Sequence, residues 1–215
     1  MYEEQKRQVI ETGIKLHKYH LISLTGGNVS VRIDNHVLVT PSGMAYEDLH
    51  TDDIIVMDLH GNVIEGTRRP SVDTIAILYI MNHMSEVKAV IHTHQIFATA
   101  VGLVSDTLPA VVTTLVNATL GAVNVAPATS AASLEMGISA VNCLKGKRAV
   151  ILKQHGVITV GGTLKEALYA AVYMEDAAKT YCVARSIGPV PEMSAAQIQD
   201  AVDSFMNYGQ TASAT

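Results

Sequence analysis

The spacing of apolar positions changes along the chain, and each change predicts a different element. Residues 3–20 place Val9, Ile14 and Leu16 among charged residues at helical spacing, which predicts an amphipathic first helix. Short apolar or alternating runs follow and predict strands at residues 29–33, 37–40, 54–57, 63–64 and 89–94. The first two runs are separated by Asp34 and Asn35, a typical hairpin turn.

In the second half of the chain, segments with helical spacing of apolar residues and segments with strand-like spacing follow one another without a regular alternation. Extended segments are predicted at residues 111–116, 122–125, 148–152 and 157–160, and helices at 70–83, 133–143, 163–187 and 194–208. The last two helices each begin with a capping box, TLKE at 163–166 and SAAQ at 194–197. Because no strict βαβ rhythm is present, we expect an α/β protein of the α+β type, with a central, mostly antiparallel sheet flanked by helices.

Composition narrows the class of protein. Of 215 residues, 48% are hydrophobic and 16% are charged, which is enough apolar material for the core of one domain. We therefore expect a single domain over residues 1–215, in which the small and polar residues 209–215 form a flexible tail. The net charge of −5 disfavours a nucleic-acid partner, which would need a surplus of Lys and Arg. The polar first residues do not resemble a signal peptide, and no apolar run reaches the roughly 18 residues of a membrane span. We therefore expect a cytoplasmic protein without a membrane partner.

Histidines form the first candidate site. His92 and His94 are two positions apart at the end of a predicted strand, so their side chains lie on one face. His155 lies in a turn between two predicted strands that could bring it beside them, and Asp73 would add an oxygen ligand. Three imidazoles and a carboxylate suit Zn²⁺ or a related divalent ion. From spacing alone, two polar residues at a strand end remain an equally good interpretation.

Three turns rich in glycine and hydroxyl groups form the second candidate site, at residues 25–28, 40–43 and 70–71. Their backbone amides and hydroxyls could bind a phosphate without a lysine, and Ser71 would stand at the start of a helix. Taken singly, each is more commonly an ordinary turn. Their occurrence together with the histidines favours a binding site.

Five motifs now occur in a fixed order: GGNVSVR at 26–32, TPSG at 40–43, PSVD at 70–73, HTH at 92–94 and QHG at 154–156. With them, the chain resembles the class II aldolase/adducin family over about residues 5–209. Enzymes of this family include L-fuculose-1-phosphate aldolase, L-rhamnulose-1-phosphate aldolase and L-ribulose-5-phosphate 4-epimerase. The chain length and the segment FMNYG at 205–209 resemble the fuculose-phosphate aldolase type most.

The resemblance implies a metal site, a phosphate pocket and an assembly. His92, His94 and His155 would hold Zn²⁺, with Mn²⁺ or Co²⁺ as alternatives, and Asp73 would be both ligand and proton carrier. Tyr208 matches a catalytic tyrosine near the C-terminus of the family's aldolases, which are homotetramers with sites at subunit interfaces. The implied phosphate ligands are Thr25, Gly27, Asn28, Ser42, Gly43 and Ser71.

The implied reaction is cleavage of a ketose 1-phosphate, such as L-fuculose 1-phosphate, to dihydroxyacetone phosphate and a short aldehyde. A metal ion would stabilise the enolate as a Lewis acid. The alternatives are a pentulose-phosphate 4-epimerase, a decarboxylase of a phosphorylated 3-keto acid, and an adducin-like binding module. The adducin-like module is disfavoured because the histidines are present.

Several positions depart from the aldolase pattern. Asp73 stands where the fuculose-phosphate aldolases have Glu, and Thr113 and Thr114 follow the epimerase pattern. Asn117, however, replaces a catalytic aspartate of the epimerases and cannot carry a proton. Two further departures are Val72 in place of a phosphate-binding serine and Thr40 in place of the epimerase lysine.

Overall fold

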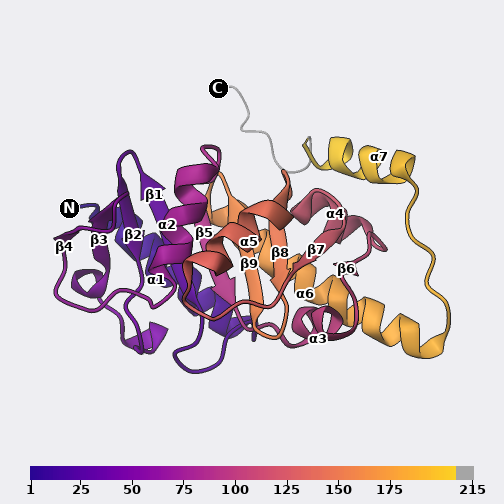
Figure 1. Cartoon of the computed structure of the whole chain (residues 1–215), viewed down its shortest axis with the longest axis horizontal. Coiled ribbons are helices and arrows are strands. Elements are labelled where there is room, and N and C mark those ends of the chain that lie inside the picture. The colour runs from indigo at the N-terminus through magenta and orange to yellow at the C-terminus, as the bar shows by residue number, and fades with distance from the viewer. Residues whose placement is uncertain (207–215) are drawn as a thin grey trace, which may run out of the picture.

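A computed structural model of the protein describes residues 1–206 (Figure 1). Within them, one nine-stranded sheet has the spatial order β4-β3-β2-β1-β5-β9-β8-β7-β6. The strands are β1 (Asn28–Ile33), β2 (His36–Val39), β3 (Ile55–Asp58), β4 (Val63–Glu65), β5 (Ala89–Thr93), β6 (Thr107–Leu108), β7 (Val123–Ala126), β8 (Ala149–Leu152) and β9 (Gly156–Gly161). Every neighbouring pair is antiparallel except β7 and β8, so the predicted mostly antiparallel sheet is confirmed.

Helices cover both faces of the sheet because strand side chains alternate between them. On one face, Val90 and Ile158 pack with Ile80 of α2 and residues of α5. On the other face, Ile91 packs with residues of α1 and α6. The helices are α1 (Glu3–Lys18), α2 (Thr74–His83), α3 (Ile96–Val104), α4 (Thr113–Thr119), α5 (Leu134–Leu144), α6 (Leu164–Ile187) and α7 (Ala195–Met206), with 3₁₀ turns η1 (Tyr46–Asp48) and η2 (Thr51–Asp53).

Two sequence predictions of elements are wrong. Residues 111–116 were expected to be extended, but α4 is a helix that buries Leu115 and Val116, because packing against α6 and α7 outweighs the β-propensity of the local valines. The helix expected from residue 70 begins at Thr74, since Pro70 instead forms a β-bridge with Pro41. The helix α3 was not expected from the sequence.

The C-terminal helix α7 lies beside α4 at the end of a long connection from α6 (Figure 1). The predicted capping box is confirmed at its start, where Ser194 and Gln197 exchange side chain to backbone hydrogen bonds of 2.8 and 3.3 Å. The Met193 amide donates to the Ala110 carbonyl at 2.8 Å, and Ala201 is buried. Tyr208 and the expected tail at residues 209–215 lie outside the described residues.

No helix in residues 1–206 has the length and apolar character needed to cross a membrane. The longest, α6, has 24 residues, and Thr163 caps its start by accepting a hydrogen bond of 3.2 Å from the Glu166 amide through its hydroxyl. The return bond of Glu166 goes to the Gly162 amide, one residue before the position that the capping box predicted.

Candidate active site

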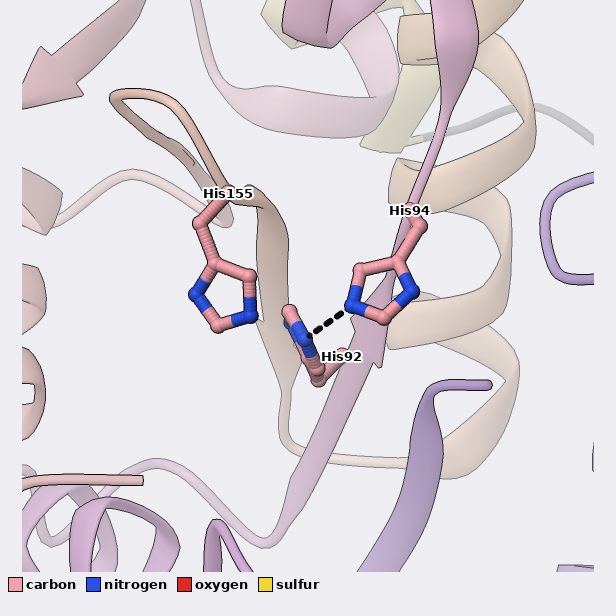
Figure 2. Close-up of side chains that lie close together, drawn as sticks. All are labelled: His92, His94 and His155. Carbon is pink, nitrogen blue, oxygen red and sulfur yellow. Dashed lines mark hydrogen bonds between the residues drawn. The ribbon is translucent and has the colours of Figure 1, made fainter. Parts of the chain in front are cut away.

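Pairing of β5 with β9 brings the three histidines together. His92 lies on β5 opposite Ile158, His94 follows the end of β5, and His155 is in the turn that joins β8 to β9. The His92 and His94 Nε2 atoms are 3.0 Å apart, and one ligand nitrogen from each of the three rings lies within 4.8 Å of the others. Figure 2 shows the three rings facing one another. The predicted histidine cluster is therefore present in the fold.

The turn at residues 154–156 depends on its backbone. Gln154 has a positive φ of 62°, and the His155 amide donates to the Leu152 carbonyl at 3.1 Å. A Cβ atom at Gly156 would lie 2.4 Å from the Thr93 carbonyl oxygen and 3.0 Å from a ring carbon of His94. Only glycine therefore allows this turn to approach β5 so closely.

His92 has the protonation that metal binding requires. The His92 ring is buried, and its Nδ1 lies 2.8 Å from the Val157 carbonyl oxygen, so Nδ1 carries the proton and Nε2 keeps its lone pair. Burial, reinforced by His94 and His155, lowers the pKa of His92 to about 3. Partial burial of its ring also lowers the pKa of His94, with a further contribution from His155. Three ring nitrogens gathered this closely fit a divalent metal ion.

Asp73 lies beside the cluster. It is the residue before α2, yet its carboxylate does not cap that helix, and its Oδ2 instead accepts from Asn28 Nδ2 at 2.8 Å. The same oxygen lies 3.9 Å from His92 Nε2. Burial raises the pKa of Asp73 above its ordinary value, while His155, the bond from Asn28 and His94 act in the opposite direction. A carboxylate in this environment can exchange a proton or bind a cation.

The second and third turns meet each other. Pro41 and Pro70 form a β-bridge, the Ser42 amide donates to the Arg69 carbonyl at 3.0 Å, and the Ser71 amide donates to the Thr40 carbonyl at 3.1 Å. Because these two amides are already paired, the groups that remain for a ligand include the serine hydroxyls. Ser42 is exposed and Ser71 is buried, two residues before Asp73 in the chain. Gly43 has a φ of 74° and open space around its Cα atom.

The first turn wraps around the end of β5. Gly27 has a φ of 73°, and a Cβ atom there would lie 2.5 Å from the His92 carbonyl oxygen. Asn28, on the strand that follows, lies opposite His92 in the β1–β5 register, and its Oδ1 is buried without a partner among the described residues. Thr25 is exposed at the start of the turn. The hydrogen bond from Asn28 to Asp73 joins this turn to the Ser71 segment.

Asn117 lies on α4 and contacts α7. With its amide oriented so that the nitrogen faces two carbonyls, it donates to Ala201 at 2.7 Å and to Thr113 at 3.1 Å. It therefore attaches α7 to α4, a role that the sequence did not indicate. The sequence also did not reveal the Val157 carbonyl that orients His92, because a backbone contact between distant strands leaves no residue-type signal.

Comparisons with known proteins agree with this geometry. Residues 7–182 match the family model described as the class II aldolase and adducin N-terminal domain. An L-fuculose 1-phosphate aldolase structure is 30% identical, with a TM-score of 0.89 over 94% of this chain and 95% of that one. The L-fuculose-1-phosphate aldolase from Thermus thermophilus is 26% identical, with a TM-score of 0.76 over 85% of this chain and 96% of that one.

A more distant structure shows the same fold. The aldolase II superfamily protein from Pseudomonas syringae is 19% identical, with a TM-score of 0.82 over 97% of this chain and 86% of that one. The match of the family model spans most of the sequence and includes every candidate residue from Thr25 to His155. The chain therefore belongs to the class II aldolase and adducin family.

Proposed function

We propose that the protein is a metal-dependent aldolase that cleaves a ketose 1-phosphate to dihydroxyacetone phosphate and a short aldehyde. The observation that carries this proposal is the convergence of His92, His94 and His155 beside buried Asp73. The similarity to an L-fuculose 1-phosphate aldolase makes L-fuculose 1-phosphate the first substrate to test.

The three histidines would hold the ion, and Zn²⁺ is the first choice for a set of neutral imidazoles, with Mn²⁺ or Co²⁺ as alternatives. When bound, the ion would supply Lewis acidity to stabilise the enolate that carbon–carbon cleavage leaves behind. The hydrogen bond from His92 Nδ1–H to the Val157 carbonyl fixes the tautomer and the ring orientation that coordination needs.

The paired turns would bind the substrate phosphate. Ser42 and Ser71 would donate through their hydroxyls, and Gly43, which has open space around it, would allow close approach of a ligand. Gly27 would belong to the same pocket, as the family resemblance implies. Thr25 would add a hydroxyl from the first turn, and Asn28 an amide. Binding energy at the phosphate end would then orient the reacting end of the substrate.

Asp73 would carry the proton of the reacting carbon. Burial raises its pKa, which suits a carboxyl group that accepts and returns a proton. In cleavage, Tyr208 would accept the proton that the substrate hydroxyl loses as it becomes the aldehyde, and in the reverse condensation it would return this proton to the aldehyde oxygen. Both assignments follow from family resemblance, as does a homotetramer with sites at its subunit interfaces.

A 4-epimerase is the second candidate, because Asp73, Thr113 and Thr114 are the residue types of the family's epimerase pattern. The engagement of Asn117 with α7 counts against it, because this side chain is an amide and already holds the Ala201 carbonyl. A 3-keto acid phosphate decarboxylase would use the same metal chemistry, but no further feature of the site favours it.

Release of dihydroxyacetone phosphate from L-fuculose 1-phosphate tests the proposal, measured with a coupled dehydrogenase and with or without a chelator. Metal-dependent release supports the aldolase. Metal binding without release would reject this substrate, and pentulose 5-phosphates would be assayed next. A rate that the chelator leaves unchanged would contradict the metal-dependent reaction.

A further inference from the structure

The segment that follows β5, Gln95 and the first residues of α3, contacts α6 at three successive turns of that helix. The buried Gln95 side chain donates to the Ala171 carbonyl at 2.9 Å. One turn further along α6, Glu175 accepts from two backbone amides at the start of α3, Phe97 at 2.9 Å and Ala98 at 3.0 Å. A third contact, one turn later, places the Lys179 ammonium 5.8 Å from the centre of the Phe97 ring.

Glu175 serves α3 as a cap supplied from a distant part of the chain. The first amides of a helix have no partner within the helix, and Gln95, which precedes α3, makes no side-chain cap. A carboxylate that accepts two such amides also meets the positive end of the helix dipole. The bond therefore fixes where α3 begins relative to α6.

His94 is the ligand whose position depends most on this attachment. The His92 ring has its own anchor at the Val157 carbonyl, and the backbone of His155 is fixed in a tight turn. His94 stands between the last residue of β5 and Gln95. Its Nε2 lies 3.0 Å from His92 Nε2, and its ring centre is 5.4 Å from that of His155. A shift at the start of α3 would thus move the His94 nitrogen directly.

We infer that Glu175 is a positioning residue that holds His94 in the geometry for metal binding. The inference rests on the proposed metal site but not on the substrate. Ligand orientation by supporting hydrogen bonds commonly changes metal affinity by about 10–100-fold. Because Glu175 acts through the backbone of residues 97 and 98, we expect an effect near the lower limit.

Glu175→Gln tests this inference, because the amide keeps the size of the side chain but removes one acceptor and the charge. Glu166→Gln is the matched control, since Glu166 lies on the same helix and also accepts a backbone amide, from Gly162 at 2.7 Å, but belongs to the opposite end of β9. Zn²⁺ and Co²⁺ affinity would be measured by competition with a chromophoric chelator, together with the melting temperature of each metal-free protein.

The expected result is an affinity about tenfold lower in Glu175→Gln and within about twofold of the wild type in Glu166→Gln. Hydrogen exchange of residues 94–98 in the metal-free protein should also become faster in Glu175→Gln alone. A second variant, Gln95→Met, removes the bond to Ala171 at nearly constant volume and should lower affinity in the same direction.

Unchanged affinity in Glu175→Gln would overturn the inference, as would equal losses in both variants that follow their melting temperatures. Absence of metal binding by the wild type would overturn both the inference and the proposed chemistry. Wild-type protein that binds Co²⁺ but cleaves no sugar phosphate would contradict the proposed function only, and the comparison of the two variants would still decide the role of Glu175.

Discussion

Asn28 Nδ2 donates a hydrogen bond of 2.8 Å to Asp73 Oδ2 and so ties the first strand of the sheet to the residue before α2. Both side chains are buried, and Asn28 lies opposite His92 in the sheet. This bond therefore fixes the Asp73 carboxylate beside the histidine cluster.

Replacement of Asn28 tests whether that position matters for catalysis. In Asn28→Ala, we expect kcat to fall by about tenfold, or about 1.4 kcal/mol, with little loss of bound metal. Steady-state kinetics and metal analysis measure the two effects. Ser30→Ala is the control, since Ser30 is buried two residues along the same strand and bonds to the Val90 carbonyl. Equal losses in both variants would contradict a specific role of Asn28.

Removal of one imidazole should release the metal. His94→Ala deletes an exposed side chain, so we expect the fold to persist while most bound metal and activity are lost. Metal content after gel filtration measures this. His83→Ala, which deletes an exposed histidine stacked on Tyr79, should keep both. Full metal content in His94→Ala would refute the ligand assignment.

The close approach at Gly156 predicts a steric effect. In Gly156→Ala, the new methyl group would lie 2.4 Å from the Thr93 carbonyl oxygen, so the β8–β9 turn must move. We expect the free energy of unfolding to fall by about 1–3 kcal/mol, measured by urea denaturation. Gly188→Ala, with open space around the added atom, should change it by less than about 0.5 kcal/mol. Similar stabilities for the two variants would contradict the packing.

The low pKa of His92 predicts an acid-sensitive fold in the absence of metal. This pKa is about 3 in the folded protein and about 6.5 in an unfolded chain, so between these values the unfolded state binds one more proton. The contribution of His92 to the free energy of unfolding is therefore fully present above about pH 6.5. Below that it falls by roughly 1.4 kcal/mol per pH unit, down to the pKa of the folded state. The lowered pKa of His94 acts in the same direction. Urea unfolding of metal-free protein at pH 7.5 and 5.5 measures the loss, and equal free energies would contradict it.

Asn117 predicts an outcome that separates α7 attachment from epimerase chemistry. In Asn117→Asp, a carboxylate would face the Ala201 and Thr113 carbonyl oxygens, and the repulsion should release α7. We expect faster proteolysis between residues 188 and 194 and no gain of epimerase activity. Asn142→Asp, at an exposed position of α5, is the control. A new epimerase activity without faster proteolysis would contradict the interpretation of Asn117.

Local patterns predicted the parts of the site that local geometry determines. The two-residue period of a strand correctly predicted that the His92 and His94 side chains lie together. The capping box correctly predicted where α7 begins. The prediction failed at residues 111–116, where burial of α4 against distant helices decided the conformation.

Contacts between distant segments had no local signal. The bond from Asn28 to Asp73 spans 45 residues, and the bonds from Glu175 to the start of α3 span 77 and 78. Such pairs depend on how strands and helices meet in space, and neither residue type nor periodicity specifies that meeting. The turn between two predicted strands allowed His155 to lie beside the other histidines, and the family resemblance then implied that it would.

The strand order divides the sheet into two consecutive blocks of sequence, and among the described strands the two blocks are hydrogen-bonded to each other where β5 pairs with β9. Residues 28–93 supply the five strands on one side of this seam, and residues 107–161 supply the four on the other. His92 and His94 lie at the end of the first block, and His155 lies in the second. A bound ion would therefore cross-link the two blocks. If the chain were cut between residues 105 and 106, neither fragment would hold all three imidazoles. Three-imidazole binding of Co²⁺ would then appear only on mixing, as a direct signal that the two halves had reassembled.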